Sequence, residues 1–141
     1  MEHLLSRNAS SIYALLRVVA GLLFAAHGAQ KIFGFFGGTE VQPGTLMGVA
    51  GIIELLGGVC IALGLFTRPL AFLSSGEMAV AYFMAHAPHG PWPILNKGEL
   101  AVLYAFLFLH VASRGAGAYS LDALLSRGHN RFPFRLRTRA T

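Results

Sequence analysis

One long apolar stretch, from Arg17 to Gly38, carries four polar side chains that lipid does not accept unpaired. Its sequence is RVVAGLLFAAHGAQKIFGFFGG, and its many apolar residues are typical of a membrane-spanning helix. An ionisable group at the bilayer centre costs roughly 2.5–3.5 kcal/mol on insertion scales, so such groups usually face protein or water. Partners for Arg17, His27, Gln30 and Lys31 must therefore come from the rest of the chain.

The composition indicates a chain built for lipid rather than for water. Hydrophobic residues make up 55% of the 141 residues and charged residues 12%, against about 25% charged residues in a soluble domain. The formal net charge of +5 does not indicate nucleic-acid binding, because the basic residues lie mostly at helix ends and near the C-terminus. The single cysteine, Cys60, allows no intramolecular disulfide and no CxxC redox pair.

Four apolar segments predict an all-α, polytopic membrane protein with a bundle of four transmembrane helices. They run from about Ser11 to Phe33, Leu46 to Phe66, Pro69 to Ala87 and Lys97 to Ser113. A helix needs about 20 residues to cross the bilayer core, so the third and fourth segments need interfacial residues to complete a span. We expect this transmembrane domain to occupy residues 1–125 and a basic cytoplasmic tail to occupy residues 126–141.

The distribution of basic residues predicts that both termini lie in the cytoplasm. With four spans, most arginines fall on one side of the membrane, whereas Lys31 and Lys97 fall on the other. Cytoplasmic loops carry an excess of Lys and Arg, so the loops at 34–45 and 88–96 are expected to face outward. The tail, with five arginines between Arg127 and Arg139, is expected to contact anionic lipid.

Polar residues from three segments are expected to converge in the outer half of the bundle. Lys31 lies one turn from His27 on the same helix face, and Glu54 lies at a comparable depth in the second segment. We therefore predict that Glu54 pairs with His27, with Lys31 or with both. Tyr82 and His86 reach the same level from the third segment. These five residues are the candidates for a ligand-binding pocket.

Arg17 and Glu77 are predicted to form a second buried ion pair, in the inner half of the bundle. Buried ion pairs can also fix helix register without any chemistry, so both pairs could be structural latches. A metal site built on His86 and His89 is disfavoured, because Pro88 interrupts the helix between them. No metal site is predicted.

Binding of a quinone is the more specific hypothesis for the function of the outer cluster. The ring carbonyls of a quinone exchange protons, so a histidine or carboxylate must reach them, and aromatic side chains must flank the ring. The outer cluster and Trp92 contain such groups. The combination has low specificity, since any polar cluster inside a membrane protein contains similar residues.

Several spaced motifs resemble the DoxX family of small bacterial membrane proteins. They are Arg17-x-x-x-Gly21, His27-Gly28-x-x-Lys31-x-x-Gly34, Gly51-x-x-Glu54-x-x-Gly57-Gly58, Gly64-Leu65-x-Thr67-Arg68 and a closing Gly115-Ala116-Gly117-Ala118-Tyr119-Ser120-Leu121-Asp122, which is similar to the family's GxGxxSLD ending. The resemblance covers residues 13–125, nearly the whole chain.

This resemblance implies a four-helix, multi-pass protein of the bacterial inner membrane. The family is named after a subunit of a thiosulfate:quinone oxidoreductase. Other members are described as oxidoreductases, or as partners in membrane complexes that handle oxidative and thiol stress. The family has no agreed catalytic residues, so Arg17, His27, Lys31, Glu54 and Arg68 are carried over only as positions that match the motif.

Two functions from different classes remain open at this point. The first is a membrane subunit or accessory component of a quinone-linked oxidoreductase or redox-stress system. Quinone would bind near His27, Lys31 and Glu54, and a partner protein or a second copy would supply the electron donor. The second is a non-enzymatic membrane scaffold or small-molecule transporter, whose buried charges are latches or a permeation path.

Overall fold

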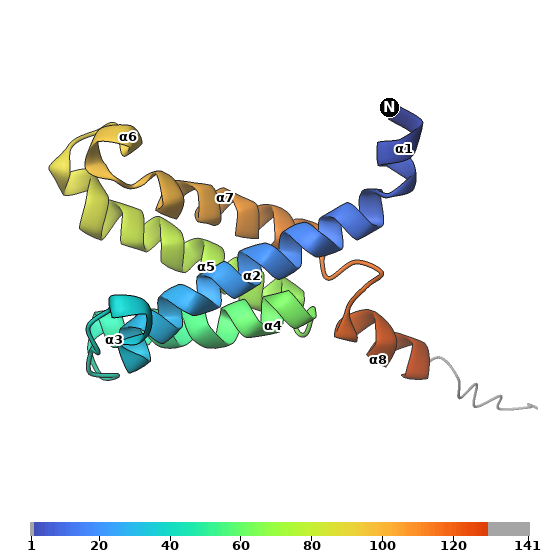
Figure 1. Cartoon of the computed structure of the whole chain (residues 1–141), viewed down its shortest axis with the longest axis horizontal. Helices are drawn as coiled ribbons and strands as arrows, with labels where there is room; N and C mark the ends of the chain where they lie inside the picture. Colours follow the sequence, from blue (N-terminus) through green and yellow to red (C-terminus); the bar gives the residue numbers. More distant parts are fainter. Residues whose placement is uncertain (1, 130–141) are drawn as a thin grey trace, which may run out of the picture.

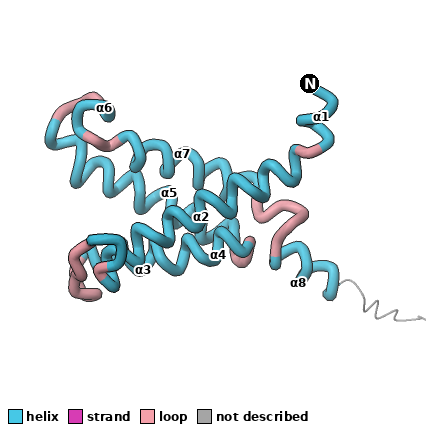
Figure 2. The backbone as a smooth tube through the Cα atoms, in the orientation of Figure 1, coloured by secondary structure: helices cyan, strands magenta, loops and turns pink. Residues whose placement is uncertain are grey.

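The computed structural model describes residues 2–129, which fold into helices joined by short loops (Figures 1 and 2). No strand is present among these residues. The four predicted apolar segments are all helical, and the all-α fold class is confirmed. The long helical segments are α2 (Ala9–Phe33), α3–η2–α4 (Leu46–Ile52, Ile53–Gly57 and Gly58–Leu63), α5–η3 (Thr67–Ala81 and Tyr82–His86) and α7 (Glu99–Arg114). The short helices include α1 (Glu2–Arg7), α6 (Pro93–Asn96) and α8 (Leu121–His129).

Two of these segments have the length and apolar character that a membrane span requires. They are Ala9–Phe33 and Leu46–Leu63, and within residues 2–129 no other helical segment meets both conditions. The third segment is a 15-residue α-helix continued by a π-helical turn, and the fourth has 16 residues. By length and composition, the chain thus has two candidate membrane spans among its described residues.

The helices associate as two antiparallel pairs, α2 with α3–α4 and α5 with α7. Figure 1 shows the pairs crossing near their middle and separating toward the ends that carry α3 and α6. Their common core lies at the crossing, where Phe24, Ile61, Ala71, Phe108 and Val111 are almost completely buried. The rings of Phe24 and Phe108 meet edge to face, with centroids 4.7 Å apart. A core at the crossing leaves room between the pairs where they diverge.

Glycines bring the backbone of α2 into direct contact with that of α3–α4. A Cβ atom at Gly28 would lie 2.3 Å from the backbone nitrogen of Leu55. A Cβ at Gly21 would lie 2.6 Å from the nitrogen of Ala62, and one at Gly58 would lie 2.5 Å from that of Ala25. Small residues allow such close approach between helices in membranes. This contact fixes the position of α2 along the axis of the second segment. It therefore also fixes which side chains of the two segments lie side by side in the site described below.

Replacing Gly28 with alanine is expected to destabilise the protein by about 1–3 kcal/mol, the usual cost of forcing extra volume into a packed interface. The Gly76→Ala variant is the matched control, because a Cβ at Gly76 meets nothing within 4 Å. Unfolding in detergent micelles by denaturant titration measures both. A Gly28→Ala protein as stable as the wild type would show that the two backbones do not touch.

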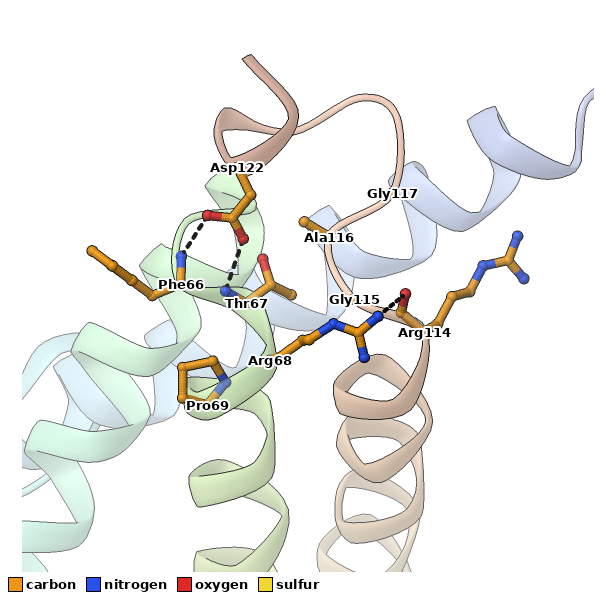
Figure 3. Close-up of a pocket in the computed structure, with 9 residues that line it drawn as sticks. All are labelled: Phe66, Thr67, Arg68, Pro69, Arg114, Gly115, Ala116, Gly117 and Asp122. Carbon is orange, nitrogen blue, oxygen red and sulfur yellow. Dashed lines mark hydrogen bonds between the residues drawn. The ribbon is translucent and has the colours of Figure 1, made fainter. Parts of the chain in front are cut away.

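The α4–α5 turn is held by the residues that follow α7. The Asp122 carboxylate accepts hydrogen bonds from the backbone N–H groups of Phe66 (2.9 Å) and Thr67 (3.1 Å), so it caps the start of α5 from a distant part of the chain (Figure 3). The Asp122 N–H donates to the Gly64 carbonyl (2.8 Å). Gly64 has a φ of +72°, and a Cβ there would lie 2.4 Å from Ser120 Cβ. The closing motif, Gly115 to Asp122, therefore acts as a structural clamp that ties the segment after α7 to the α4–α5 turn.

Two arginines complete this clamp by binding backbone carbonyls at helix ends. The last carbonyls of a helix have no partner within the helix. The Arg68 guanidinium donates to three of them at the end of α7, those of Ala112, Ser113 and Arg114 (3.1, 2.7 and 3.2 Å). The Arg17 guanidinium is 1% exposed and donates to the carbonyls of Ile61, Ala62 and Tyr119.

The predicted domain boundary between residues 125 and 126 falls inside α8, which continues to His129. The first residues of the predicted tail are therefore helical. The remainder, residues 130–141, lies outside the described part of the chain, and the expected contact of its arginines with lipid stays a prediction.

Candidate functional site

A π-helical turn, η2, places Glu54 inside the molecule. It interrupts the second segment at Ile53–Gly57, between α3 and α4. A π-turn widens the helix by one residue per turn and is frequent at functional sites. Glu54 lies on the side that faces α2 and α5 and is only 2% exposed. The fold thus buries the Glu54 carboxylate, which needs a cation or a hydrogen-bond donor as its partner.

Lys31, from the last turn of α2, is that partner. Its Nζ lies 2.6 Å from Glu54 Oε1, within hydrogen-bond and ion-pair distance. The Lys31 side chain is 26% exposed and that of Glu54 is 3% exposed, so the pair joins the interior to the surface of the bundle. The predicted pairing of Glu54 with Lys31 is confirmed. His27 instead packs edge-on against the Tyr104 ring, with centroids 6.4 Å apart.

Glu77 on α5 adds a second carboxylate to the pair. It lies within electrostatic reach of both Glu54 and Lys31. One oxygen of each carboxylate, Glu54 Oε2 and Glu77 Oε2, is buried and accepts no hydrogen bond from the described residues. Buried carboxylate oxygens are normally hydrogen-bonded.

The predicted Arg17–Glu77 ion pair is wrong. Arg17 bonds to backbone carbonyls next to the α4–α5 turn, whereas Glu77 lies beside Glu54. Ala62 is eight residues beyond Glu54 along its segment, which is about 12 Å of helix rise. Arg17 therefore lies roughly two fifths of a bilayer core away from Glu77 along the helix axis.

A cavity of about 660 Å³ opens beside the three charged residues, between the two helix pairs. Lys31 and Glu77 are the charged residues in its lining, and the rest of the lining is apolar or glycine. Several of these apolar side chains are also half exposed on the outer surface of the bundle, which shows that the cavity opens sideways. They include Leu46, Met47, Phe72, Leu73, Val80 and Met84.

Tyr82 and His86 do not line this cavity. They belong to the π-helical turn η3, where their rings stack with centroids 6.4 Å apart. His86 Nδ1 lies 3.1 Å from the Asn96 carbonyl oxygen, and the Asn96 side chain donates to the Gly90 carbonyl (2.8 Å). These contacts hold the α5–α7 loop in place. The five residues predicted to form one outer cluster are therefore divided between the cavity, the loop and the core.

Sequence reasoning missed that Glu77 belongs with Glu54, although the spacing contains the signal. Glu54 lies 12 residues before Phe66, and Glu77 lies ten residues after Thr67. Two helices joined by a tight turn are antiparallel, so residues equally far from the turn lie at the same depth. Within residues 2–129, no three histidine, cysteine or acidic side chains gather closely enough to share a metal ion.

These features define a small all-helical membrane protein with an apolar lateral cavity and a buried cluster of charges. The profile of the DoxX family matches residues 12–87, more than half of the chain. A relative from Haemophilus influenzae (strain Rd), named "Uncharacterized protein", is 46% identical over 116 residues, which are 77% of this chain and 87% of the relative. The chain belongs to the DoxX family.

Two further relatives have more informative names. "Inner membrane protein YqjF" of Escherichia coli (strain K12) is 29% identical over 79% of this chain and 89% of its own length. "Putative oxidoreductase CatD" of Bacillus subtilis (strain 168) is 30% identical over 81% of this chain and 87% of its own length. No solved structure matches the chain. The family and the YqjF relative support a location in the bacterial inner membrane.

Proposed function

We propose that this protein is a membrane subunit or accessory component of a quinone-linked redox system, and that it binds the quinone in the lateral cavity. One observation carries the proposal: an apolar cavity of about 660 Å³ with only Lys31 and Glu77 as charged groups among its described lining residues. Ligand sites are typically apolar with a few placed polar groups. The name of the CatD relative, "Putative oxidoreductase", favours a redox role over a purely structural one.

The residues present fit a quinone in size, polarity and access. The Lys31 ammonium group can donate a hydrogen bond to a ring carbonyl while it remains paired with Glu54. The unpartnered Glu77 Oε2 can accept one from a ring hydroxyl and hold its proton. The half-exposed apolar wall gives a prenyl tail a path to the lipid. When bound, the quinone supplies two-electron, two-proton chemistry, and a partner protein supplies the electron donor.

A titration of the nanodisc-embedded protein with a short-chain ubiquinone or menaquinone analogue tests this function. We expect saturable binding of both the quinone and the reduced quinol forms of the analogue. Binding of the quinol should weaken about tenfold or more in Glu77→Gln, because its ring hydroxyl then loses a hydrogen bond to a charged group. His86→Ala is the matched control, because His86 lies outside the cavity lining. This variant should bind the analogue as tightly as the wild type does. The absence of saturable binding to the folded wild-type protein would contradict the proposal.

The carboxyl group of Glu77 in the cavity lining, which has an oxygen without a hydrogen-bond partner among the described residues, favours one alternative, a transporter for lipophilic cations. Tetraphenylphosphonium is a suitable probe, since it is apolar and permanently charged. Under the alternative, this cation binds the wild type saturably and loses affinity in Glu77→Gln, whereas the quinone analogue does not bind. The quinone proposal predicts the opposite order of affinities.

We further propose that all four long segments cross the membrane, with both termini in the cytoplasm. The excess of arginine at the end that carries α8 supports this orientation. In a Cys60→Ser background, a cysteine at Glu40 should react with a membrane-impermeant maleimide added to spheroplasts, and a cysteine at Ser126 should react only after lysis. Reaction at both positions before lysis would contradict the orientation.

A further inference from the structure

A second cavity, of about 440 Å³, lies at the opposite end of the molecule from the α3 and α6 loops. It is formed where the α4–α5 turn, the last residues of α7 and the loop before α8 meet (Figure 3). Arg68, Arg114, Thr67 and Asp122 supply its polar lining. The clamp described above uses Arg68 and Asp122 but leaves several polar groups of this cavity without a role.

The positive charge at this cavity is not balanced by the protein. Arg68 binds neutral carbonyls, and the Arg114 guanidinium lies over the Tyr13 ring, 4.5 Å from its centroid. Among the described residues, no carboxylate lies within ion-pair distance of either arginine. Asp122 uses both oxygens to cap α5. Two guanidinium groups and one carboxylate leave the lining with a formal charge of +1.

One edge of the Arg68 guanidinium remains open. Arginine has five N–H donors, and the bonds to the end of α7 use Nη1 and one side of Nη2. The remaining donors, on Nε and Nη2, form the edge that binds two oxygens of a carboxylate or phosphate at once. A Cβ at Gly115 would lie 3.0 Å from Nε and 3.1 Å from Nη2. The glycine therefore keeps this edge clear of side-chain atoms.

Thr67 provides an independent indication of a ligand. It lines the cavity, is 0% exposed, and its Oγ1 has no hydrogen-bond partner among the described residues. A buried hydroxyl without a partner destabilises the folded state. A ligand oxygen in the cavity would satisfy this hydroxyl and would bind the open edge of Arg68 as well.

We propose that this cavity binds a phosphate group, and that the group belongs to the headgroup of an anionic phospholipid. Arginine forks match phosphate oxygens in geometry and charge. A phosphate group from a lipid fits the surroundings better than one from a soluble compound. Phe66 lines the cavity and is 66% exposed, and Phe72, six residues further along the chain, is 67% exposed. The exposed apolar face of α5 gives the acyl chains a surface beside the headgroup. The proposal does not depend on the quinone site.

Lipid binding to the detergent-purified, full-length protein tests this, measured by native mass spectrometry with dioleoylphosphatidylglycerol and dioleoylphosphatidylcholine. We expect the anionic lipid to bind saturably and at least about tenfold more tightly than the zwitterionic one, because its headgroup adds no positive charge. Thr67→Val should weaken the binding of phosphatidylglycerol by about tenfold, the effect of one hydrogen bond to a charged group. The Arg114 side chain points away from Thr67 and lies over the Tyr13 ring (Figure 3), so Arg114→Gln should weaken the binding only about threefold, through the loss of an exposed charge. Arg7→Gln, which removes the same charge from exposed α1, should not.

Three results would overturn the proposal. Equal loss of binding in Arg7→Gln and Arg114→Gln would reduce the effect to diffuse surface charge. A Thr67→Val protein that binds phosphatidylglycerol like the wild type would show that the hydroxyl does not face the ligand; valine preserves the shape of threonine, so the variant should fold. If sn-glycerol 3-phosphate or inorganic phosphate displaces the lipid at comparable concentrations, the site belongs to a soluble phosphate compound.

Discussion

Replacing Arg17 with methionine is expected to destabilise the protein by at least about 4 kcal/mol. The change removes three hydrogen bonds from a charged donor, each worth about 1.5–3 kcal/mol, and leaves the carbonyls of Ile61, Ala62 and Tyr119 without their donor. Two of these carbonyls are at the end of α4, and the third is in the loop before α8. The variant should therefore release the loop from the helix end as well as lower overall stability.

Denaturant unfolding in micelles, with proteolysis of the loop before α8 as a local probe, measures this effect. Arg17→Lys is the informative comparison, because an ammonium group keeps the charge but does not form the planar fork that reaches several carbonyls. It should be intermediate in stability. If Arg17→Met unfolds at the same denaturant concentration as the wild type, the arginine does not hold the clamp together.

Replacing Lys31 with methionine is expected to cost about 3–5 kcal/mol, the usual effect of removing one member of a buried ion pair. Glu54 would then keep a buried charge beside Glu77 with no cation between them. The double variant Lys31→Met, Glu54→Gln should recover most of this loss, because a neutral amide needs no counter-charge. A full double-mutant cycle, measured by denaturant unfolding, isolates the energy of the pair.

Glu99→Gln is the control for this cycle, since Glu99 is an exposed acid at the start of α7 and should be near neutral. If the double variant is as unstable as Lys31→Met alone, then loss of the Lys31 packing, rather than an unpaired Glu54, is the cause. That result would remove the electrostatic account of the site.

The all-helical fold could be predicted from the sequence, because apolar segments of membrane-span length leave few other structures open to the chain. The pairing of Glu54 with a cationic group on the neighbouring helix could also be predicted from its depth, although depth left both His27 and Lys31 as partners, and the structure selects Lys31. The lengths of the apolar segments predict the helical fold, and the positions of charged residues along these segments predict which of them lie at the same depth.

The partner of Arg17 could not be predicted from charge alone. A search for an opposite charge selects Glu77. The carbonyls at a helix end, which have no partner within the helix, also accept hydrogen bonds from a guanidinium, and they carry no signature in the sequence. Likewise, the π-turns at Glu54 and His86 rotate the residues after them, and no residue pattern marks them. Tyr82 and His86, both in the second of these turns, hold a loop instead of lining the cavity.

The motif residues separate into two groups with different roles. Arg17, Arg68 and Asp122 bind backbone groups and hold the helix ends together. Lys31 lines the lateral cavity, and Glu54 is its buried ion-pair partner behind the lining. The first group holds the helix ends of this chain together, and the second lies where we propose that a ligand binds.

Photolabelling with an azido-quinone analogue, followed by peptide mapping, tests the central claim most directly. The account predicts that the label attaches to the cavity wall on α3 and α5, around Met47, Phe72 and Met84, and that excess unlabelled quinone prevents this. Labelling that is confined to other faces of the bundle, or that unlabelled quinone does not reduce, would contradict a quinone site in the lateral cavity.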